Sequence, residues 1–194
     1  ENIIRIDVDN SKQPNSRWYS GSGIYRDVNL WTGKDVYISH DKLRITTLSV
    51  NDDMAVIEVC AQLKNIIGHG LEAECLIEIK KDGQKTASDT QRVVFRSEQM
   101  QTVRVQIPIE HPKKWSPKQP ALYECHITTK FDDKICDEAV SNFGIRVLAL
   151  DPVRGLQING ETVKLRGTCI HHDNGVIGAE TFKEAEWYLS LIHI

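Results

Sequence analysis

The sequence lacks the features that mark a membrane protein, a nucleic-acid-binding protein or a zinc protein. No apolar run approaches the roughly 18 to 20 residues with which a helix crosses a bilayer. Lys and Arg together number 24 against 27 Asp and Glu, for a formal net charge of −3, so the basic stripe of a nucleic-acid-binding surface is missing. The cysteines form no Cys-X-X-Cys pair, which leaves no zinc-ligand spacing. We expect no nucleic acid, no membrane and no metal site for this chain.

Cysteine and the N-terminus bear on the compartment. Five cysteines are an odd number for disulfide pairing, and four of them lie in apolar alternating runs, where a thiol is usually a small buried hydrophobe. Unpaired thiols favour a reducing compartment and therefore the cytoplasm. Residues 1–9 alternate like a strand, without a signal peptide's charged head and apolar stretch. Since the chain does not start with Met, we expect it to begin inside a fold, which leaves the compartment open.

Most of the chain alternates between apolar and polar residues, as β-strands do. Asp82-Gly83 is a strong two-residue hairpin signal, and Val103, Val105 and Ile107 share one face of their run. The strand-like runs are residues 42–50, 54–64, 72–80, 102–107, 122–131 and 135–147. About seven short strands over roughly 105 residues predict an immunoglobulin-like β-sandwich.

The two flanks follow other patterns. Residues 1–35 hold a Gly/Ser-rich stretch between aromatic residues and a strand. Beyond residue 148, Asn159-Gly160 signals a second hairpin. Thr181 with Glu184 fits a helix-capping box, and apolar residues recur at helical spacing as far as Ile192. The sequence therefore predicts one complete domain, residues 36–147, between two incomplete ones, residues 1–35 and 148–194.

Three segments, taken in order and spacing, resemble the family 2 glycoside hydrolases. They are residues 17–28 (RWYSGSGIYRDV), residues 111–123 (HPKKWSPKQPALY) followed by residues 143–146 (FGIR), and residues 159–175 (NGETVKLRGTCIHHDNG). The first is similar to the end of that family's sugar-binding jelly-roll domain, and the second to the late part of its immunoglobulin-like domain. The third resembles the hairpin and first strand of its catalytic (β/α)₈ barrel, and its sequence looks most like the β-galactosidase branch.

This resemblance implies a mainly β chain, in which an immunoglobulin-like β-sandwich lies between the end of a jelly roll and the first βα unit of a truncated (β/α)₈ barrel. It implies a fragment of a retaining glycosidase that cleaves terminal β-D-galactosides in carbohydrate catabolism. β-Glucuronidase and β-mannosidase activities remain alternatives. A non-catalytic carbohydrate-binding or adhesion module is a further alternative, which the His-His-Asp strand end and the following helix disfavour.

The catalytic carboxylates are expected outside this chain. Retaining glycosidases need two carboxyl groups roughly 5 to 5.5 Å apart, and the resemblance places both glutamates beyond Ile194. Glu180, Glu184 and Glu186 lie on or before the first barrel helix, whereas barrel active sites lie at the C-terminal ends of the strands. We therefore expect no catalytic residue here and no activity from the chain alone.

Substrate contact is what remains for this chain to provide. The resemblance implies that His171, at the end of the first barrel strand, binds a sugar hydroxyl; a structural histidine bonded to loop backbone is the alternative. His172, Asp173 and Asn15 are further candidates, with Asn15 considered because Arg17 stands where the family has an acidic residue. Zinc at His-His-Asp is disfavoured, because adjacent residues on an extended chain point to opposite sides.

Cofactor and assembly are less defined by the sequence. No cofactor is identifiable in this chain, although the resemblance allows Mg²⁺ or Na⁺ in the full-length enzyme. It also allows a homo-oligomer of the full-length protein, with a β-galactoside oligosaccharide or glycoside as substrate. The closing residues 189–194 resemble the tail left where an assembled reading frame runs into sequencing-adaptor DNA, so part of this end is expected not to be native.

Overall fold

The computed structural model describes residues 3–9, 11, 23–24, 28–96, 99–167, 169 and 182–192. The chain divides into two compact units. One unit is Thr32–Lys164, and the other combines Glu1–Trp31 with Leu165–Ile194. Among the residues described, no helix is long and apolar enough to cross a membrane.

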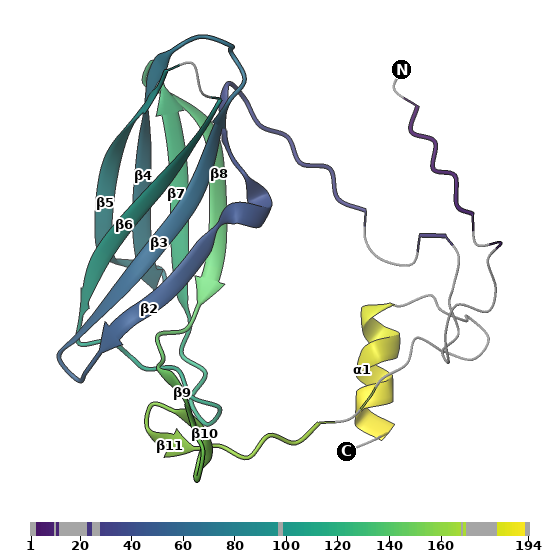
Figure 1. The fold of residues 1–194 in the computed structure, drawn as a ribbon, viewed down its shortest axis with the longest axis vertical. Helices are drawn as coiled ribbons and strands as arrows, with labels where there is room; N and C mark the ends of the chain where they lie inside the picture. The colour runs from purple at the N-terminus through teal and green to yellow at the C-terminus, as the bar shows by residue number, and fades with distance from the viewer. Residues whose placement is uncertain are drawn as a thin grey trace. The chain divides into compact units, whose positions relative to one another are not determined.

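The described part of the unit Thr32–Lys164 is a sandwich of two antiparallel sheets with a small third sheet attached (Figure 1). In the first sheet, β3 pairs with β6 on one side and with β1 and β2 on the other. The second sheet has the order β5-β4-β7-β8. The first-sheet strands are β1 (Val36–Ile38), β2 (Arg44–Val50), β3 (Met54–Asn65) and β6 (Met100–Glu110). The second-sheet strands are β4 (Leu71–Lys81), β5 (Gln84–Phe95), β7 (Tyr123–Phe131) and β8 (Lys134–Phe143).

Apolar side chains at alternating strand positions build the core between these two sheets. Val103, Val105 and Ile107 of β6 all point inward and are buried, as their shared face predicts. They meet an equally regular inward set from β4, of which Ile77 and Ile79 are fully buried. The mainly β fold with an immunoglobulin-like sandwich is therefore confirmed.

The predicted Asp82-Gly83 hairpin turn forms where the sequence places it, and a second turn of the same kind joins β7 to β8. Asp82 and Gly83 join β4 to β5 with φ of 52° and 79°. Asp132 and Asp133, with φ of 52° and 57°, join β7 to β8. Two successive positive φ values match the right-handed twist of the flanking strands, which is why Asp and Gly are favoured there.

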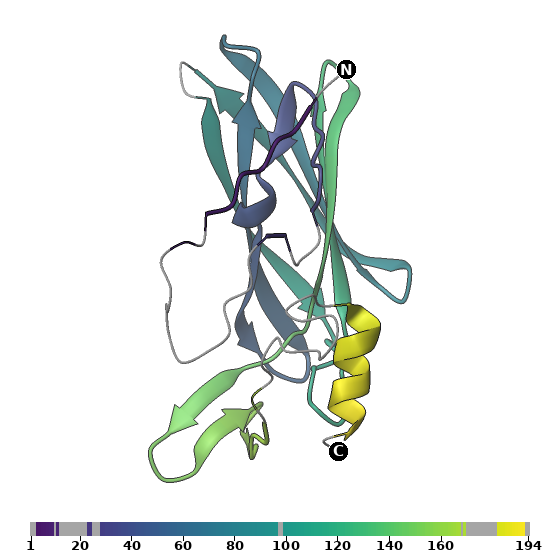
Figure 2. The same ribbon diagram turned by 90° about the vertical axis from the view of Figure 1, so that its right-hand side faces the viewer.

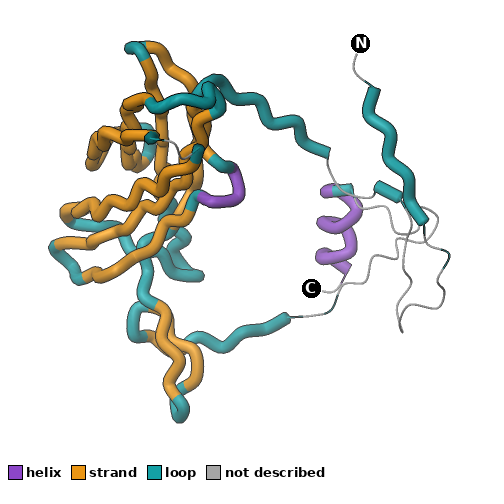
Figure 3. Tube along the Cα trace, turned by 45° about the horizontal axis from the view of Figure 1, so that its top comes forward, coloured by secondary structure: helices purple, strands orange, loops and turns teal. Residues whose placement is uncertain are grey.

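Strand β1 holds the two sheets together along one edge. It pairs with β3 through one side, where the Ser39 N–H donates to the Gln62 carbonyl over 2.8 Å. Its other side is satisfied by side chains of the second sheet. Thr129 Oγ1 donates to the Val36 carbonyl over 2.9 Å, and Asp137 Oδ2 accepts from the Ile38 N–H over 2.8 Å. A short 3₁₀ helix, η1 (His40–Lys42), then leads into β2 (Figure 3).

The third sheet is a small meander that follows the sandwich in sequence (Figure 2). It consists of β9 (Leu148–Asp151), β10 (Gly155–Ile158) and β11 (Glu161–Thr162), in the order β11-β10-β9. Asn159 and Gly160 form the predicted turn with φ of 52° and 83°. The run expected as one strand over residues 135–147 ends earlier, since β8 stops at Phe143 and the chain turns before β9.

The flanks differ from the sequence expectation. Helix α1 (Lys183–Ile192) forms where helical spacing predicts it, and Thr181 of the predicted capping box lies outside the described residues. No strand forms over the described residues 163–167 and 169, where the first barrel strand was expected. A parallel strand needs a neighbouring strand for its backbone groups, and none is present among the described residues. Residues 3–9 likewise alternate like a strand without joining a sheet.

Candidate functional site

The four residues predicted to bind sugar, His171, His172, Asp173 and Asn15, all lie outside the described residues. The structure therefore neither brings them together nor separates them. Of the glutamates set aside as non-catalytic, Glu184 is exposed on α1 and Glu186 is half-buried. The last strands described before the His171 segment form the β9–β11 sheet, and a junction around Trp115 connects this sheet to the sandwich.

Trp115 is the centre of that junction. Its backbone N–H donates to the Ile145 carbonyl over 2.9 Å, and the guanidinium carbon of Arg146 lies 4.4 Å from the centroid of its ring. That distance is within the range of a cation–π contact. A Cβ at Gly144 would lie 2.8 Å from Trp115 Cβ, so the close approach of the two segments requires glycine. Because Ile145 itself is fully buried in the core, the segment around Trp115, called the Trp115 corner, is fixed to the sandwich.

Asn159 connects this corner to the small sheet. Its side-chain Nδ2 donates to the Trp115 carbonyl over 2.9 Å, and its Oδ1 accepts from the Val147 N–H over 3.0 Å. Its own backbone N–H donates to the Val147 carbonyl over 2.9 Å. The sequence shows Asn159 as a turn residue. Its bonds to partners 44 and 12 residues away carry no local signal and were missed.

The outer face of the second sheet carries cross-strand rows of opposite charge. Glu74 lies opposite both Arg92 and Lys130, while Glu72 pairs with Arg92 at 2.5 Å. Such opposed pairs stabilise neighbouring strands by a few tenths of a kcal/mol or more. A hollow of about 370 Å³ lies over these strands. It is lined by Glu72, Ala73, Glu74, Arg92, Lys130, Phe131, Asp132 and Asp133. Because Glu72 pairs with Arg92 and Glu74 with Lys130 across the strands, the hollow is better explained as a surface of the sheet than as a ligand site.

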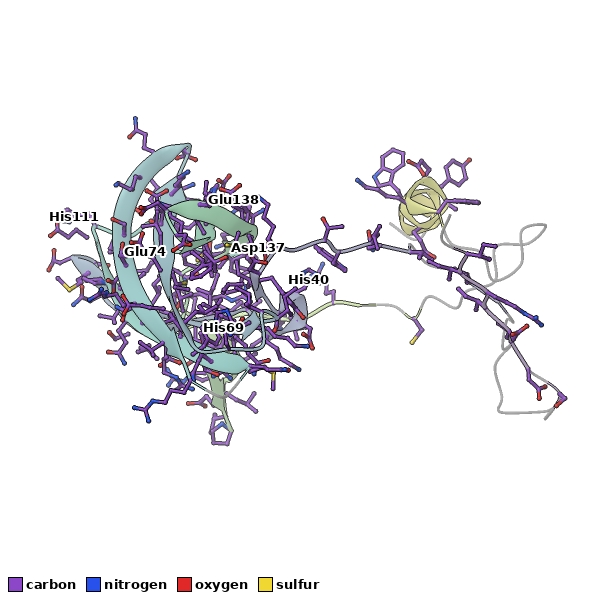
Figure 4. All side chains as sticks on the ribbon, turned by 90° about the horizontal axis from the view of Figure 1, so that it is seen from above. His40, His69, Glu74, His111, Asp137 and Glu138 are labelled. Atoms are coloured by element: carbon purple, nitrogen blue, oxygen red, sulfur yellow. The ribbon has the colours of Figure 1, made fainter. Side chains whose placement is uncertain are left out.

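The titratable groups of the described sandwich do not converge on a reactive centre. Burial raises the pKa of the Cys75 and Cys125 thiols to about 12, which removes them as nucleophiles near neutral pH. His40, His69 and His111 come from separate parts of the sandwich (Figure 4). Within the described ranges, no group of three or more His, Cys, Asp or Glu side chains is placed to hold a metal ion.

The comparisons with known proteins identify the family. Residues 36–146 match the sequence model of the glycosyl hydrolases family 2. The chain belongs to glycosyl hydrolase family 2. The family predicted from the three sequence segments is thereby confirmed, and the matched residues include the sandwich and the Trp115 corner.

Two relatives of this family 2 chain match nearly its whole length. It is 31% identical over 189 residues to a β-galactosidase, BoGH2A, of Bacteroides ovatus, covering 92% of this chain and 21% of that protein. It is 30% identical over 178 residues to a putative β-glucuronidase of Formosa agariphila, covering 92% of this chain and 16% of that protein. The chain thus spans about a fifth of the length of these curated relatives.

Solved structures agree on the fold. A family 2 glycosyl hydrolase of Bacteroides cellulosilyticus matches with a TM-score of 0.83 and 31% identity, over 96% of this chain and 26% of that one. A β-glycosidase of Bacteroides vulgatus matches with a TM-score of 0.78 and 28% identity, over 96% of this chain and 23% of that one. The relatives' names include both galactosidase and glucuronidase, so they do not by themselves select a sugar.

Proposed function

We propose that this chain is part of a retaining glycoside hydrolase that cleaves terminal β-D-galactosides. The observation that carries the proposal is the match to the Bacteroides ovatus β-galactosidase along 92% of the chain. The Ile-His-His-Asp-Asn-Gly motif of residues 170–175 resembles the galactosidase branch and adds support. The chain contributes the sandwich and substrate contacts, and the hydrolytic carboxylates belong to the rest of the full-length protein.

In this proposal His171 binds a hydroxyl of the sugar held in the active site. A neutral imidazole has one nitrogen that donates and one that accepts, so it holds a hydroxyl without adding charge near pH 7. Such a bond supports catalysis when it strengthens as the sugar ring flattens toward the oxocarbenium-like transition state. His172, Asp173 and Asn15 serve as further polar contacts around the same sugar.

The reaction itself proceeds through two carboxyl groups outside this chain. One protonates the leaving oxygen while the other attacks the anomeric carbon, and water then hydrolyses the glycosyl-enzyme with retention of configuration. The 194-residue chain is therefore inactive alone. We also propose a cytoplasmic location, from the unpaired cysteines, and Mg²⁺ or Na⁺ as an accessory ion of the full-length enzyme.

A β-glucuronidase is the second candidate, and one observation favours it. Arg17 stands where the resembling family has an acidic residue at the end of the jelly roll. A guanidinium binds a carboxylate with two parallel hydrogen bonds, which suits the C6 carboxylate of a glucuronide better than a neutral galactoside. The Formosa agariphila relative also bears a glucuronidase name.

The deciding experiment expresses the full-length protein, meaning the product of the complete gene that carries this segment. Initial rates are compared on nitrophenyl β-D-galactoside, β-D-glucuronide and β-D-mannoside. We expect the galactoside to be hydrolysed fastest, and proton NMR to show the β-anomer released first. A faster glucuronide would replace the proposal by the second candidate, and release of the α-anomer would refute retention.

The role of His171 is tested in the same protein. We expect His171→Ala to lower kcat/KM on the preferred glycoside by about 100-fold, the scale of one lost transition-state hydrogen bond. Lys164→Ala, at an exposed position earlier in the same segment, is the matched control and should leave kcat/KM unchanged. Equal kcat/KM values for the two variants would assign His171 to structure.

A further inference from the structure

The Asn159-Gly160 turn combines a chemically labile pair of residues with a structural role. In an Asn-Gly pair, the backbone nitrogen of the glycine can attack the side-chain amide carbon of the asparagine, because glycine has no Cβ to hinder the approach. The two residues form the turn between β10 and β11, in which Gly160 is exposed and Asn159 is half-buried. Solvent therefore reaches the nitrogen that would attack.

The junction holds both ends of the Asn159 side-chain amide. Its Nδ2 donates to the Trp115 carbonyl over 2.9 Å, and its Oδ1 accepts from the Val147 N–H over 3.0 Å. The amide carbon has to leave both hydrogen bonds before it can form a ring with the Gly160 nitrogen. The reaction is thus coupled to local opening, and its rate follows the fraction of molecules in which the junction is open.

We propose that Asn159 is a deamidation site whose rate is controlled by the junction, and that the modification irreversibly detaches the β9–β11 sheet from the Trp115 corner. The Gly160 nitrogen loses its proton to solvent base and bonds to Asn159 Cγ, while the Nδ2 group takes up a proton and leaves as ammonia. Water then opens the five-membered succinimide ring to an aspartate or an isoaspartate. No group is oxidised or reduced.

Either product removes the contact that Asn159 makes. An aspartate carries an acceptor oxygen where Nδ2 donates, so two acceptors would meet at the Trp115 carbonyl. An isoaspartate adds one carbon to the main chain within the turn that pairs Ile158 with Glu161. A short β-meander has little stability by itself, so we expect the modified sheet to open far more often than the native one.

The first test measures the rate of the reaction in the full-length protein at mildly alkaline pH. Trypsin releases residues 155–164 as one peptide, in which Asn159 is the sole asparagine. Mass spectrometry then detects the replacement of the amide by a carboxyl, after a brief digestion at mildly acidic pH that limits further deamidation. We expect the reaction to be at least about 10-fold slower in the native protein than in the synthetic peptide of residues 155–164, because two hydrogen bonds have to open first.

Opening the junction should accelerate the reaction. In Gly144→Ala the added Cβ meets Trp115 at 2.8 Å, and we expect deamidation to become at least about 3-fold faster. Ser88→Ala, at an exposed position of β5, is the control and should leave the rate unchanged. Wild-type protein in urea below its unfolding midpoint opens the junction without a substitution and should give the same acceleration, whether or not Gly144→Ala folds.

The second test measures the consequence with Asn159→Asp, which reproduces the aspartate product. We expect hydrogen exchange of the β9–β11 amides to accelerate at least about 10-fold. Asn142→Asp, the same substitution at an exposed position of β8, should leave that exchange unchanged.

Three results would overturn the proposal. Equal rates in the native protein and in the peptide would show that the junction exerts no control. An Asn159 that stays unmodified in Gly144→Ala and in urea, while the peptide reacts, would not be a deamidation site. Unchanged exchange in Asn159→Asp would show that the modification leaves the sheet attached. Because the readouts are mass and hydrogen exchange, the test is independent of the sugar that the enzyme hydrolyses.

Discussion

Replacing Thr129 with Val should weaken the edge where β1 joins the two sheets. Thr129 is fully buried, and its Oγ1 donates to the Val36 carbonyl over 2.9 Å. Valine has nearly the same shape but no hydroxyl, so the substitution leaves the Val36 carbonyl without this donor. A buried acceptor left unsatisfied costs about 1 to 3 kcal/mol.

We expect Thr129→Val to lower the free energy of unfolding by about 2 kcal/mol, which corresponds to roughly 6 °C in melting temperature for a unit of this size. Denaturation in urea, followed by circular dichroism, measures the loss at an unchanged m-value. Thr128→Val is the matched control, because Thr128 is the adjacent residue of β7 and points to the outer face. Its effect should stay within about 0.5 kcal/mol. Equal stabilities of the two variants would refute the role given to the Thr129 hydroxyl.

Three further predictions concern the junction, the thiols and the small sheet. Gly144→Ala should destabilise the chain by about 1 to 3 kcal/mol and shift its tryptophan fluorescence, because the added Cβ meets Trp115 at 2.8 Å. Cys75 and Cys125 should resist iodoacetamide at pH 8 in the native chain and react once urea unfolds it, as mass spectrometry will show, since burial raises the pKa of each to about 12. Hydrogen bonds from the N–H groups of Arg154 and Val153 in the following turn lower the pKa of Asp151 below its usual value of 3.8. The stability that these bonds give the turn is present above that value and is lost as pH falls through the folded pKa. Hydrogen exchange in this turn should therefore accelerate in acid, and Asp151→Asn should abolish that acceleration.

The sequence predicts the sandwich well because its strands alternate strongly. Inward positions of β3, β4, β6 and β7 are apolar almost without a break, and the Asp82-Gly83 and Asn159-Gly160 turns have recognisable chemistry. Strands β1 and β5 are not among the predicted runs, for a physical reason. Both lie at sheet edges, and the first half of β5 is largely exposed and polar, so little apolar alternation marks it. β1 is held in place by β3 and by side chains of the second sheet, which are distant in sequence, whereas β5 is held by its hairpin with β4.

The candidate site is predicted to a smaller extent. His171 and its neighbours follow from resemblance to the family, since no local rule makes a histidine at a strand end a sugar ligand. The Asn159 bonds to Trp115 and Val147 depend on how the small sheet packs against the end of the sandwich. No periodic pattern in the sequence marks such bonds. Strand β9, with its exposed Leu148 and Leu150, lies outside the runs that the sequence predicts.

The most direct test of the central claim locates the catalytic nucleophile in the full-length protein. A 2-fluoro β-galactoside traps the glycosyl-enzyme of a retaining galactosidase, and peptide mapping by mass spectrometry then identifies the labelled carboxylate. We predict stoichiometric labelling of one glutamate outside the 194 residues of this segment. A label on any residue from 1 to 194, or no label on a protein that hydrolyses galactosides, would contradict the account.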